Sequence, residues 1–168
     1  LMAVLVLAIS SCKEEKNTEK RLEAKSVDVS SESEAVKLVM KNYKDAIQNL
    51  TTEGTTALFT KEAAVFESGG SEGTYENYVS HHLGPELNHF DSFEFSDYTI
   101  DVELDMPFAF TTETYIYTIA LKADNEKGTE ARIIKKKGVA TSILKKVNDE
   151  WKITKTHSSS RNIRKASH

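Results

Sequence analysis

The sequence predicts an α+β domain in which N-terminal helices cover one face of a curved antiparallel sheet. Apolar residues recur at three- and four-residue steps in the first half of the folded region, which is the period of an amphipathic helix. After about residue 90 they alternate at two-residue steps, which is the period of a strand. Helices followed by a run of long strands are typical of the α+β class.

The first helix is predicted directly after Ser31, which has the spacing of a capping box with Glu34. Its apolar stripe is Val36, Val39, Met40, Tyr43, Ile47 and Leu50. A brief strand from Ala63 to Glu67 and a glycine-rich loop from Ser68 to Gly73 are expected next. Thr74 caps a second predicted helix, which Gly84-Pro85 interrupts before a fresh turn begins.

Four long strands complete the predicted sheet. In the first strand the alternation changes phase at Ser96-Asp97, and such a slip predicts a β-bulge that bends the sheet. The other three are expected from Phe108 to Leu121, from about Arg132 to Val147, and from Trp151 to Ser159. The strands follow one another through short turns, so a meander is predicted.

The N-terminal segment has the pattern expected of a targeting signal. Leu1 to Ile9 is an unbroken apolar run, shorter than the ~20 residues that span a bilayer, and Ser10-Ser11-Cys12 follows it. This pattern resembles the lipobox of bacterial lipoproteins, which implies lipidation of Cys12 and anchoring to a membrane of the bacterial cell envelope. We therefore expect a signal and lipidation site over residues 1–12, a disordered charged tether over 13–32 and a folded domain over 33–165.

Composition excludes several classes of function. With a net charge of −4 and no basic cluster interleaved with aromatic residues, the chain is not expected to bind nucleic acid. Cys12 is the single cysteine, which excludes an internal disulfide and a cysteine-rich metal site. No phosphate-binding or dinucleotide-binding motif is present, so no cofactor is predicted.

The last predicted hairpin carries a family resemblance. It runs from Gly138 to Val147, turns, and continues through Trp151-Lys152-Ile153 to His157-Ser158-Ser159. Over about residues 33–165 the chain resembles the nuclear transport factor 2-like superfamily, which includes SnoaL-like domains and has a cystatin-like, cone-shaped fold. The resemblance implies a pocket between the concave sheet face and the helices. Because this superfamily includes enzymes, binding proteins and oligomerisation modules, it does not choose between them.

Two groups of residues are expected to reach this pocket from the sheet. His157 shares strand parity with Trp151 and Ile153, so it is predicted to point inward as an acid–base or ligand-orienting group, or as a structural histidine. Glu113, Tyr115 and Tyr117 alternate onto one face of their strand. On the concave face they supply a carboxylate and two phenols to the pocket, and on the outer face they belong to cross-strand pairs or a dimer interface.

Other candidates lie nearer the helices. Glu67, before the glycine-rich loop, is placed at the pocket mouth or in a structural turn. His82, Glu86 and His89 have a spacing that could bind zinc on an unbroken helix, but the Gly84-Pro85 break argues against it. Histidines on the surface or at the pocket mouth are the alternative.

These residues lead to two functional hypotheses. The first is an envelope-anchored domain, homodimeric through its sheet, that binds a small molecule in the cone through Glu67, His82, Glu113, Tyr115, Tyr117 and His157 or acts as an interaction module. The second is an isomerase, cyclase or hydrolase that uses His157 with a carboxylate, Glu113 or Glu67, as its acid–base pair.

Overall fold

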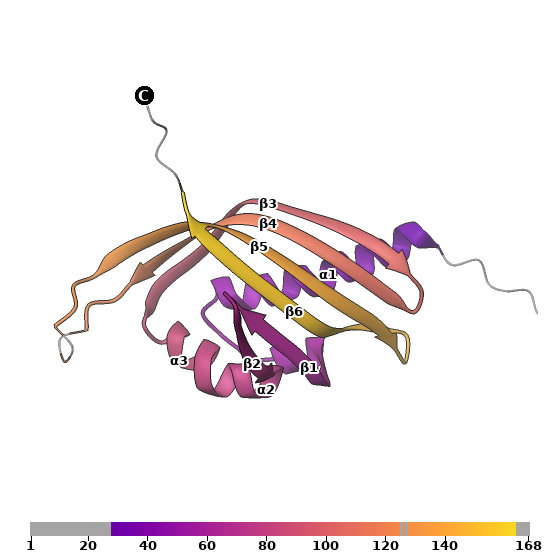
Figure 1. Ribbon diagram of the computed structural model, residues 1–168, viewed down its shortest axis with the longest axis horizontal. Helices are drawn as coiled ribbons and strands as arrows, with labels where there is room; N and C mark the ends of the chain where they lie inside the picture. Colours follow the sequence, from indigo (N-terminus) through magenta and orange to yellow (C-terminus); the bar gives the residue numbers. More distant parts are fainter. Residues whose placement is uncertain (1–27, 125, 127, 164–168) are drawn as a thin grey trace, which may run out of the picture.

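The computed structural model describes residues 28–163 except 125 and 127, and these form one curved sheet with helices on its concave side (Figure 1). In chain order the elements are α1 (Val29–Gln48), the 3-10 helix η1 (Thr55–Leu58), β1 (Phe59–Glu67), β2 (Gly70–Thr74), α2 (Tyr75–Tyr78), the π-helix η2 (Val79–Leu83), α3 (Gly84–Leu87), β3 (Phe90–Asp105), β4 (Phe108–Leu121), β5 (Arg132–Val147) and β6 (Glu150–Asn162). The expected leader, most of the tether and the lipidation site at Cys12 lie outside the described residues. Among the helices that are described, none combines the length and the apolar character needed to cross a membrane.

The sheet confirms the predicted α+β class. Its strand order is β2-β1-β6-β5-β4-β3, and β3 to β6 form the predicted antiparallel meander. The sheet as a whole is mixed rather than antiparallel, because β1 pairs in parallel with β6. The pairing of β3 with β4 shifts register between Ser96 and Thr99, and Asp97 between them has a φ of 49°. The predicted bulge is therefore present, and the strand bends there.

Helix α1 starts earlier than expected. Asp28 is its N-cap and accepts hydrogen bonds from the backbone N–H groups of Ser30 and Ser31, so the predicted Ser31–Glu34 capping box is wrong. Glu32 in the first turn accepts a hydrogen bond of 2.8 Å from the Trp151 indole N–H. Residues 28–32 therefore belong to the folded domain, whose expected start was residue 33.

The glycine-rich segment is a strand rather than the expected loop. Residues 70–74 form β2, which pairs with β1 and makes one edge of the sheet. The two residues that join the strands, Ser68 and Gly69, both have positive φ, as in the tight type I′ turns of hairpins. Glycine usually weakens a strand, so the glycines of β2 made this segment resemble a loop in the sequence.

The second helical region continues through the expected break. Thr74 caps it as predicted, and the π-turn η2 lets the Gly84 N–H donate to the carbonyl of Val79. A side chain at Gly84 would lie 2.6 Å from that carbonyl oxygen, so this position requires glycine. Gly84 keeps helical φ and ψ of −60° and −50° ahead of Pro85. As a result, His82 and Glu86 stay on the same face of the helix.

The core lies at the end of the domain where α1, β1 and β6 meet. Met40 and Tyr43 of α1 pack with Phe59 and Tyr75, whose rings stack at a centroid distance of 3.5 Å. Trp151 is 4% exposed and fills the core beside α1, as its place in the predicted strand indicated. Toward the other end of the domain, side chains do not fill the space between the sheet and the helices, and a cavity remains.

Candidate ligand-binding cavity

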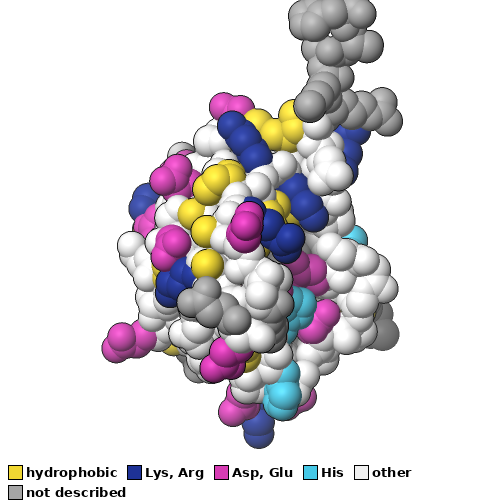
Figure 2. Space-filling model, turned by 90° about the vertical axis from the view of Figure 1, so that its left-hand side faces the viewer, with side chains coloured by type: hydrophobic (Ala, Val, Ile, Leu, Met, Phe, Trp, Pro, Cys, Tyr) yellow, Lys and Arg dark blue, Asp and Glu magenta, His cyan; other side chains and the backbone are white. Residues whose placement is uncertain are grey.

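A cavity of about 400 Å³ lies between the concave face of the sheet and the helices. Residues from α1, β1, α3 and β3 to β6 line it, so it occupies the place that the sequence predicted for a pocket. Figure 2 views the end of the molecule that carries α3 and the β4–β5 hairpin. Histidine side chains lie in its middle and lower part and hydrophobic side chains mainly in its upper half, whereas acidic side chains are spread over both halves.

Glu113, Tyr115 and Tyr117 all face the cavity, which decides between the two alternatives for β4. Glu113 is fully buried and Tyr115 nearly so. Tyr117 lies nearer the opening, and its hydroxyl is 2.9 Å from that of Ser160 on β6. The opposite, convex face of β4 carries Phe108 and Phe110 instead.

Aromatic rings make one wall of the cavity. Phe93 stacks on Tyr117 at 5.6 Å, and Phe95 meets Tyr115 edge-on at 5.1 Å. Gly138 of β5 lies directly opposite Tyr115, and a Cβ there would come within 2.2 Å of the tyrosine ring. Glycine at this position therefore lets the Tyr115 ring lie flat against the sheet and leaves the cavity open.

Two buried charged side chains of the lining, Lys44 and Glu113, contact Tyr98 of the neighbouring groove between α1 and β3, and we call these three residues the floor cluster. Glu113 Oε1 lies 3.1 Å from Lys44 Nζ and accepts a hydrogen bond of 2.7 Å from the Tyr98 hydroxyl. Glu113 Oε2 has no hydrogen-bond partner among the described residues. A buried acceptor without a donor is costly, so this atom is free to receive a hydrogen bond from a bound molecule.

Aromatic rings surround the Lys44 ammonium. It lies 5.0 Å from the centroid of Tyr115, 5.1 Å from Phe95, and 5.9 Å from both Tyr43 and Tyr98. Such rings attract a cation through their negative faces. Burial, followed by the charge of Glu113, raises the pKa of both Tyr98 and Tyr115, so both phenols stay protonated at neutral pH.

Lys44 was missed by the sequence analysis, although its position carried a signal. It follows Tyr43 and lies one turn from both Met40 and Ile47, so it falls on the apolar stripe of α1 rather than on the solvated face. A lysine inside such a stripe must either reach solvent or find a buried partner. In this helix it finds Glu113.

The floor cluster also borders a second hollow. A groove of about 590 Å³ runs between α1 and β3, and Lys44 and Phe95 line both the groove and the cavity. Leu38, Tyr98 and Ile100 add apolar surface to the groove. The Lys44 side chain thus forms part of the wall between two spaces.

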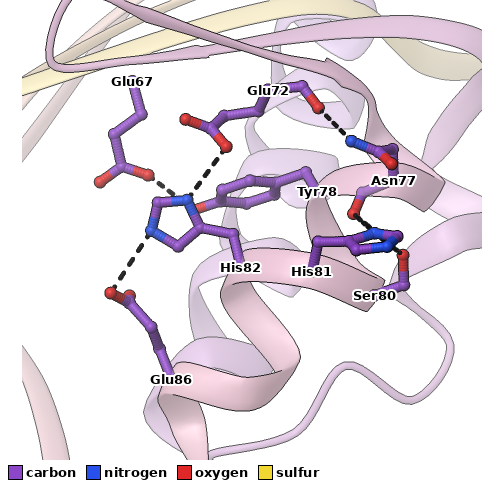
Figure 3. A network of polar contacts seen from close by, with 8 residues as sticks. All are labelled: Glu67, Glu72, Asn77, Tyr78, Ser80, His81, His82 and Glu86. Carbon is purple, nitrogen blue, oxygen red and sulfur yellow. Dashed lines mark hydrogen bonds and ion pairs between the residues drawn. The ribbon is translucent and has the colours of Figure 1, made fainter.

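At the opening, Glu67, Glu72, Tyr78, His82 and Glu86 form a second polar cluster, which we call the rim cluster (Figure 3). The Tyr78 hydroxyl donates to Glu67 at 2.9 Å. His82 lies between two carboxylates, with Nδ1 3.1 Å from Glu72 and Nε2 3.4 Å from Glu86. Glu67, Tyr78 and Glu86 line the cavity, so the predicted place of Glu67 at its mouth agrees with the structure.

The electrostatics of the rim favour a protonated histidine. Partial burial opposes the charged form of His82, but the hydrogen bond to Glu72 and the charges of Glu86, Glu67 and Glu72 outweigh it, and its pKa is raised. Burial also raises the pKa of Glu86, and the nearby His82 partly offsets that effect.

The zinc alternative does not fit this geometry. His82 and Glu86 are together, but the backbone N–H of His89 donates to the Glu86 carbonyl at the end of α3, and no contact of its ring with the rim cluster is seen in the described part of the chain. Within residues 28–163, apart from 125 and 127, no three histidine, cysteine or acidic side chains are placed to hold a metal ion.

The prediction that His157 faces the pocket is wrong. Leu144 pairs with Ile153 but Ile143 pairs with Lys155, so Thr154 is an extra residue in β6. This bulge reverses the parity of the strand, and Thr156, Ser158 and Ser160 line the cavity in place of His157. His157 is exposed on the convex face beside Thr141, so it forms no acid–base pair with Glu113.

No protein-family model matches the chain, and no curated protein matches it. Solved structures do. A candidate dehydratase of the nuclear transport factor 2-like family from Streptomyces avermitilis superposes with a TM-score of 0.67 at 15% identity, over 80% of this chain and 99% of that one. A protein with a cystatin-like fold from Caulobacter vibrioides gives a TM-score of 0.62 at 15% identity, over 77% and 89% of the two chains.

This is the nuclear transport factor 2-like fold. A candidate ketosteroid isomerase from Shewanella frigidimarina also has it, with a TM-score of 0.59 at 20% identity over 74% of this chain and 94% of that one. Sequence identities this low establish a shared nuclear transport factor 2-like fold and no shared activity. The function must therefore be argued from the cavity itself.

Proposed function

We propose that this domain binds a small ligand in the cavity, with an apolar or aromatic body along the aromatic wall and a polar head at the floor cluster. The observation that carries the proposal is the buried Glu113 Oε2, an acceptor with no donor among the described residues on the lining of an open cavity. A ligand hydroxyl or amine would supply the missing hydrogen bond. A hydrogen bond to a charged acceptor contributes about 1.5–3 kcal/mol.

The shape of the cavity supports the same proposal. Its volume of about 400 Å³ lies in the range typical of small-molecule sites, and the lining pairs apolar walls with a few converging polar groups. Glu113 is already held by Lys44 and Tyr98, so its orientation is fixed before a ligand arrives. Such preorganisation lowers the entropic cost of binding.

A catalytic role has weaker support. The expected acid–base pair needed His157 beside a carboxylate, and His157 lies on the opposite face of the sheet. We therefore favour ligand binding over catalysis as the function of the cavity. Chemical conversion of a bound molecule, detected by mass spectrometry, would favour catalysis instead.

The test compares two probes that differ in one hydrogen-bond donor. We expect 2-naphthol to bind the domain about tenfold more tightly than 2-methoxynaphthalene in isothermal titration calorimetry, because only the phenol can donate to Glu113. In Glu113→Gln the preference should shrink toward one, with circular dichroism checking that the variant is folded. Equal binding of both probes to the wild-type protein, or no binding of either, would refute the proposal.

We also propose that the domain is held at a bacterial membrane of the cell envelope through lipidated Cys12. The apolar run before Cys12 and its small flanking residues support this. Growth with an alkyne-labelled fatty acid should label the wild-type protein in the membrane fraction. Cys12→Ala should lose the label, and a labelled Cys12→Ala would contradict lipidation at this residue.

A homodimer through the convex sheet face is the third proposal. Phe110 and Val139 are 41% and 42% exposed there. The convex side of β3 carries acidic residues such as Glu103, and that of β6 carries basic ones such as Lys155. A twofold arrangement can therefore place unlike charges together.

Sedimentation tests the dimer. Phe110→Asp should shift the domain from dimer to monomer in analytical ultracentrifugation. Leu38→Asp, at an exposed position on α1, should leave the dimer unchanged. A wild-type protein that sediments as a monomer would disprove the dimer.

A further inference from the structure

We propose that Lys44 captures an aldehyde or ketone ligand covalently, as a protonated Schiff base in the floor of the cavity. The inference rests on the proposed function, since the ligand must first enter the cavity. It adds a chemical class, a carbonyl compound with an apolar or aromatic body, and it assigns the reacting atom, Lys44 Nζ.

The position of Lys44 is the first argument. Its side chain is 10% exposed, yet it lines both the cavity and the groove between α1 and β3. A carbonyl group at the end of the aromatic wall therefore meets the amine directly. Lysine amines form Schiff bases with carbonyl compounds, and here Glu113 at 3.1 Å can take the proton from Lys44 Nζ.

The charge of the product is the second argument. A protonated Schiff base keeps one positive charge at the nitrogen of Lys44. The groups that stabilise the ammonium, Glu113 at 3.1 Å and the rings of Tyr115 and Phe95 at 5.0 and 5.1 Å, would therefore stabilise the iminium as well. Burial also limits the water that hydrolyses Schiff bases on the protein surface.

Glu113 is placed to move the protons. It accepts a proton from the Lys44 ammonium, and the neutral amine adds to the carbonyl carbon with formation of a C–N bond. After proton transfer from nitrogen to oxygen, Glu113 returns its proton to the hydroxyl group of the carbinolamine, which leaves as water. The net change converts an ammonium and a carbonyl compound into an iminium and one water molecule, with no oxidant or reductant.

Glu113 Oε2 has a specific part in this sequence. Oε1 holds Lys44 and Tyr98, whereas Oε2 has no partner among the residues described. Oε2 can therefore contact the ligand oxygen while Oε1 keeps the nitrogen in place. One carboxylate thus reaches both atoms that exchange protons.

The experiment traps the adduct on the whole protein. The chain is incubated with 2-naphthaldehyde and sodium cyanoborohydride, which reduces the iminium to a stable amine, and the modified lysine is located by peptide mass spectrometry. We expect Lys44 to be labelled about tenfold faster than Lys41, which is one turn earlier on α1 and has a 67% exposed side chain. Excess 2-naphthol should slow labelling of Lys44 and leave that of Lys41 unchanged.

Matched variants sharpen the result. Lys44→Arg keeps the positive charge but cannot form a Schiff base, so fast labelling should disappear, whereas Lys41→Arg should retain it. The competition by 2-naphthol uses the wild-type protein, so it tests the site even where a variant fails to fold. Labelling spread evenly over surface lysines, or protection of no lysine by 2-naphthol, would overturn the inference. If 2-naphthol binds in calorimetry while Lys44 stays unmodified, the cavity is a ligand site and the covalent step is wrong.

Discussion

The floor and rim clusters use similar chemistry in different surroundings. Each places a basic nitrogen beside at least one carboxylate at one side of the same cavity. In the floor, the side chains of Glu113 and Lys44 are 0% and 10% exposed. In the rim, Glu72, His82 and Glu86 are 25%, 31% and 53% exposed.

Burial decides what each cluster can do. In the floor, Lys44 and Glu113 are almost entirely buried, so loss of either partner leaves an uncompensated charge, and the geometry is fixed. In the rim, solvent screens the charges and each pair contributes little to stability. The floor can therefore orient a ligand, whereas the rim can change its protonation without unfolding the domain.

Removal of the floor carboxylate should have the largest effect. We expect Glu113→Ala to lower the free energy of unfolding by about 3–5 kcal/mol, because Lys44 loses its charge partner in a buried site. The double variant Lys44→Met/Glu113→Leu should recover most of that loss, since it removes both charges. Urea denaturation measures both, and a double variant as unstable as the single one would contradict this account.

The hydrophobic core, at the end of the domain where α1, β1 and β6 meet, provides the next test. Trp151→Ala should cost about 3 kcal/mol or more, because it empties a large site in the core and removes the hydrogen bond to Glu32. Trp151→Phe retains most of the packing and should cost less. A denaturation midpoint equal to that of the wild-type protein would show that Trp151 is not buried.

The aromatic wall between the floor and rim clusters can be disturbed by a substitution on the neighbouring strand β5. Gly138→Ala places a Cβ where the Tyr115 ring lies, so we expect a loss of about 1–3 kcal/mol and weaker binding of 2-naphthol. The control is Gly70→Ala, whose Cβ would meet its nearest neighbours at 3.4 Å. Equal stability and binding of the two variants would show that Tyr115 does not need this space.

Protonation of His82 in the rim cluster should have the smallest effect on the stability of the domain, and it should appear as a dependence of stability on pH. The pKa of His82 is raised in the folded state, so its charged form stabilises the domain below about pH 6.5, and this contribution is lost as the pH rises through the folded-state pKa. NMR titration should place that pKa above about 6.5. Glu72→Gln should lower it, and an unchanged titration in this variant would contradict the rim geometry.

The architecture could be predicted from sequence because it depends on periodicity. The buried face of an element can be read from its apolar residues, as in the stripe of α1, the two-residue alternation of β3 to β6 and the phase slip at Ser96-Asp97. Strand β2 has no apolar pattern of this kind. Two of its five residues are glycines, and its pairing is fixed by the turn at Ser68-Gly69 rather than by an apolar face.

The site was predicted in part, and the errors have local causes. Glu113, Tyr115 and Tyr117 were placed correctly relative to one another because β4 is regular. His157 was misplaced because the bulge at Thr154 has no glycine or proline to mark it. Lys44 was overlooked because a charged residue on a helix is normally assigned to solvent, and its partner lies 69 positions away on β4.

The parallel pairing of β1 with β6 has a consequence for biosynthesis. The ribosome makes the hairpin of β1 and β2 before the other strands of the sheet, but the strand that joins it to them is β6, the last of the described strands. Contacts so distant in sequence slow folding, and they cannot form before the C-terminal strand has left the exit tunnel. A nascent chain that ends before Glu150 should therefore remain dependent on chaperones, and its cavity should take shape only after β6 has been synthesised.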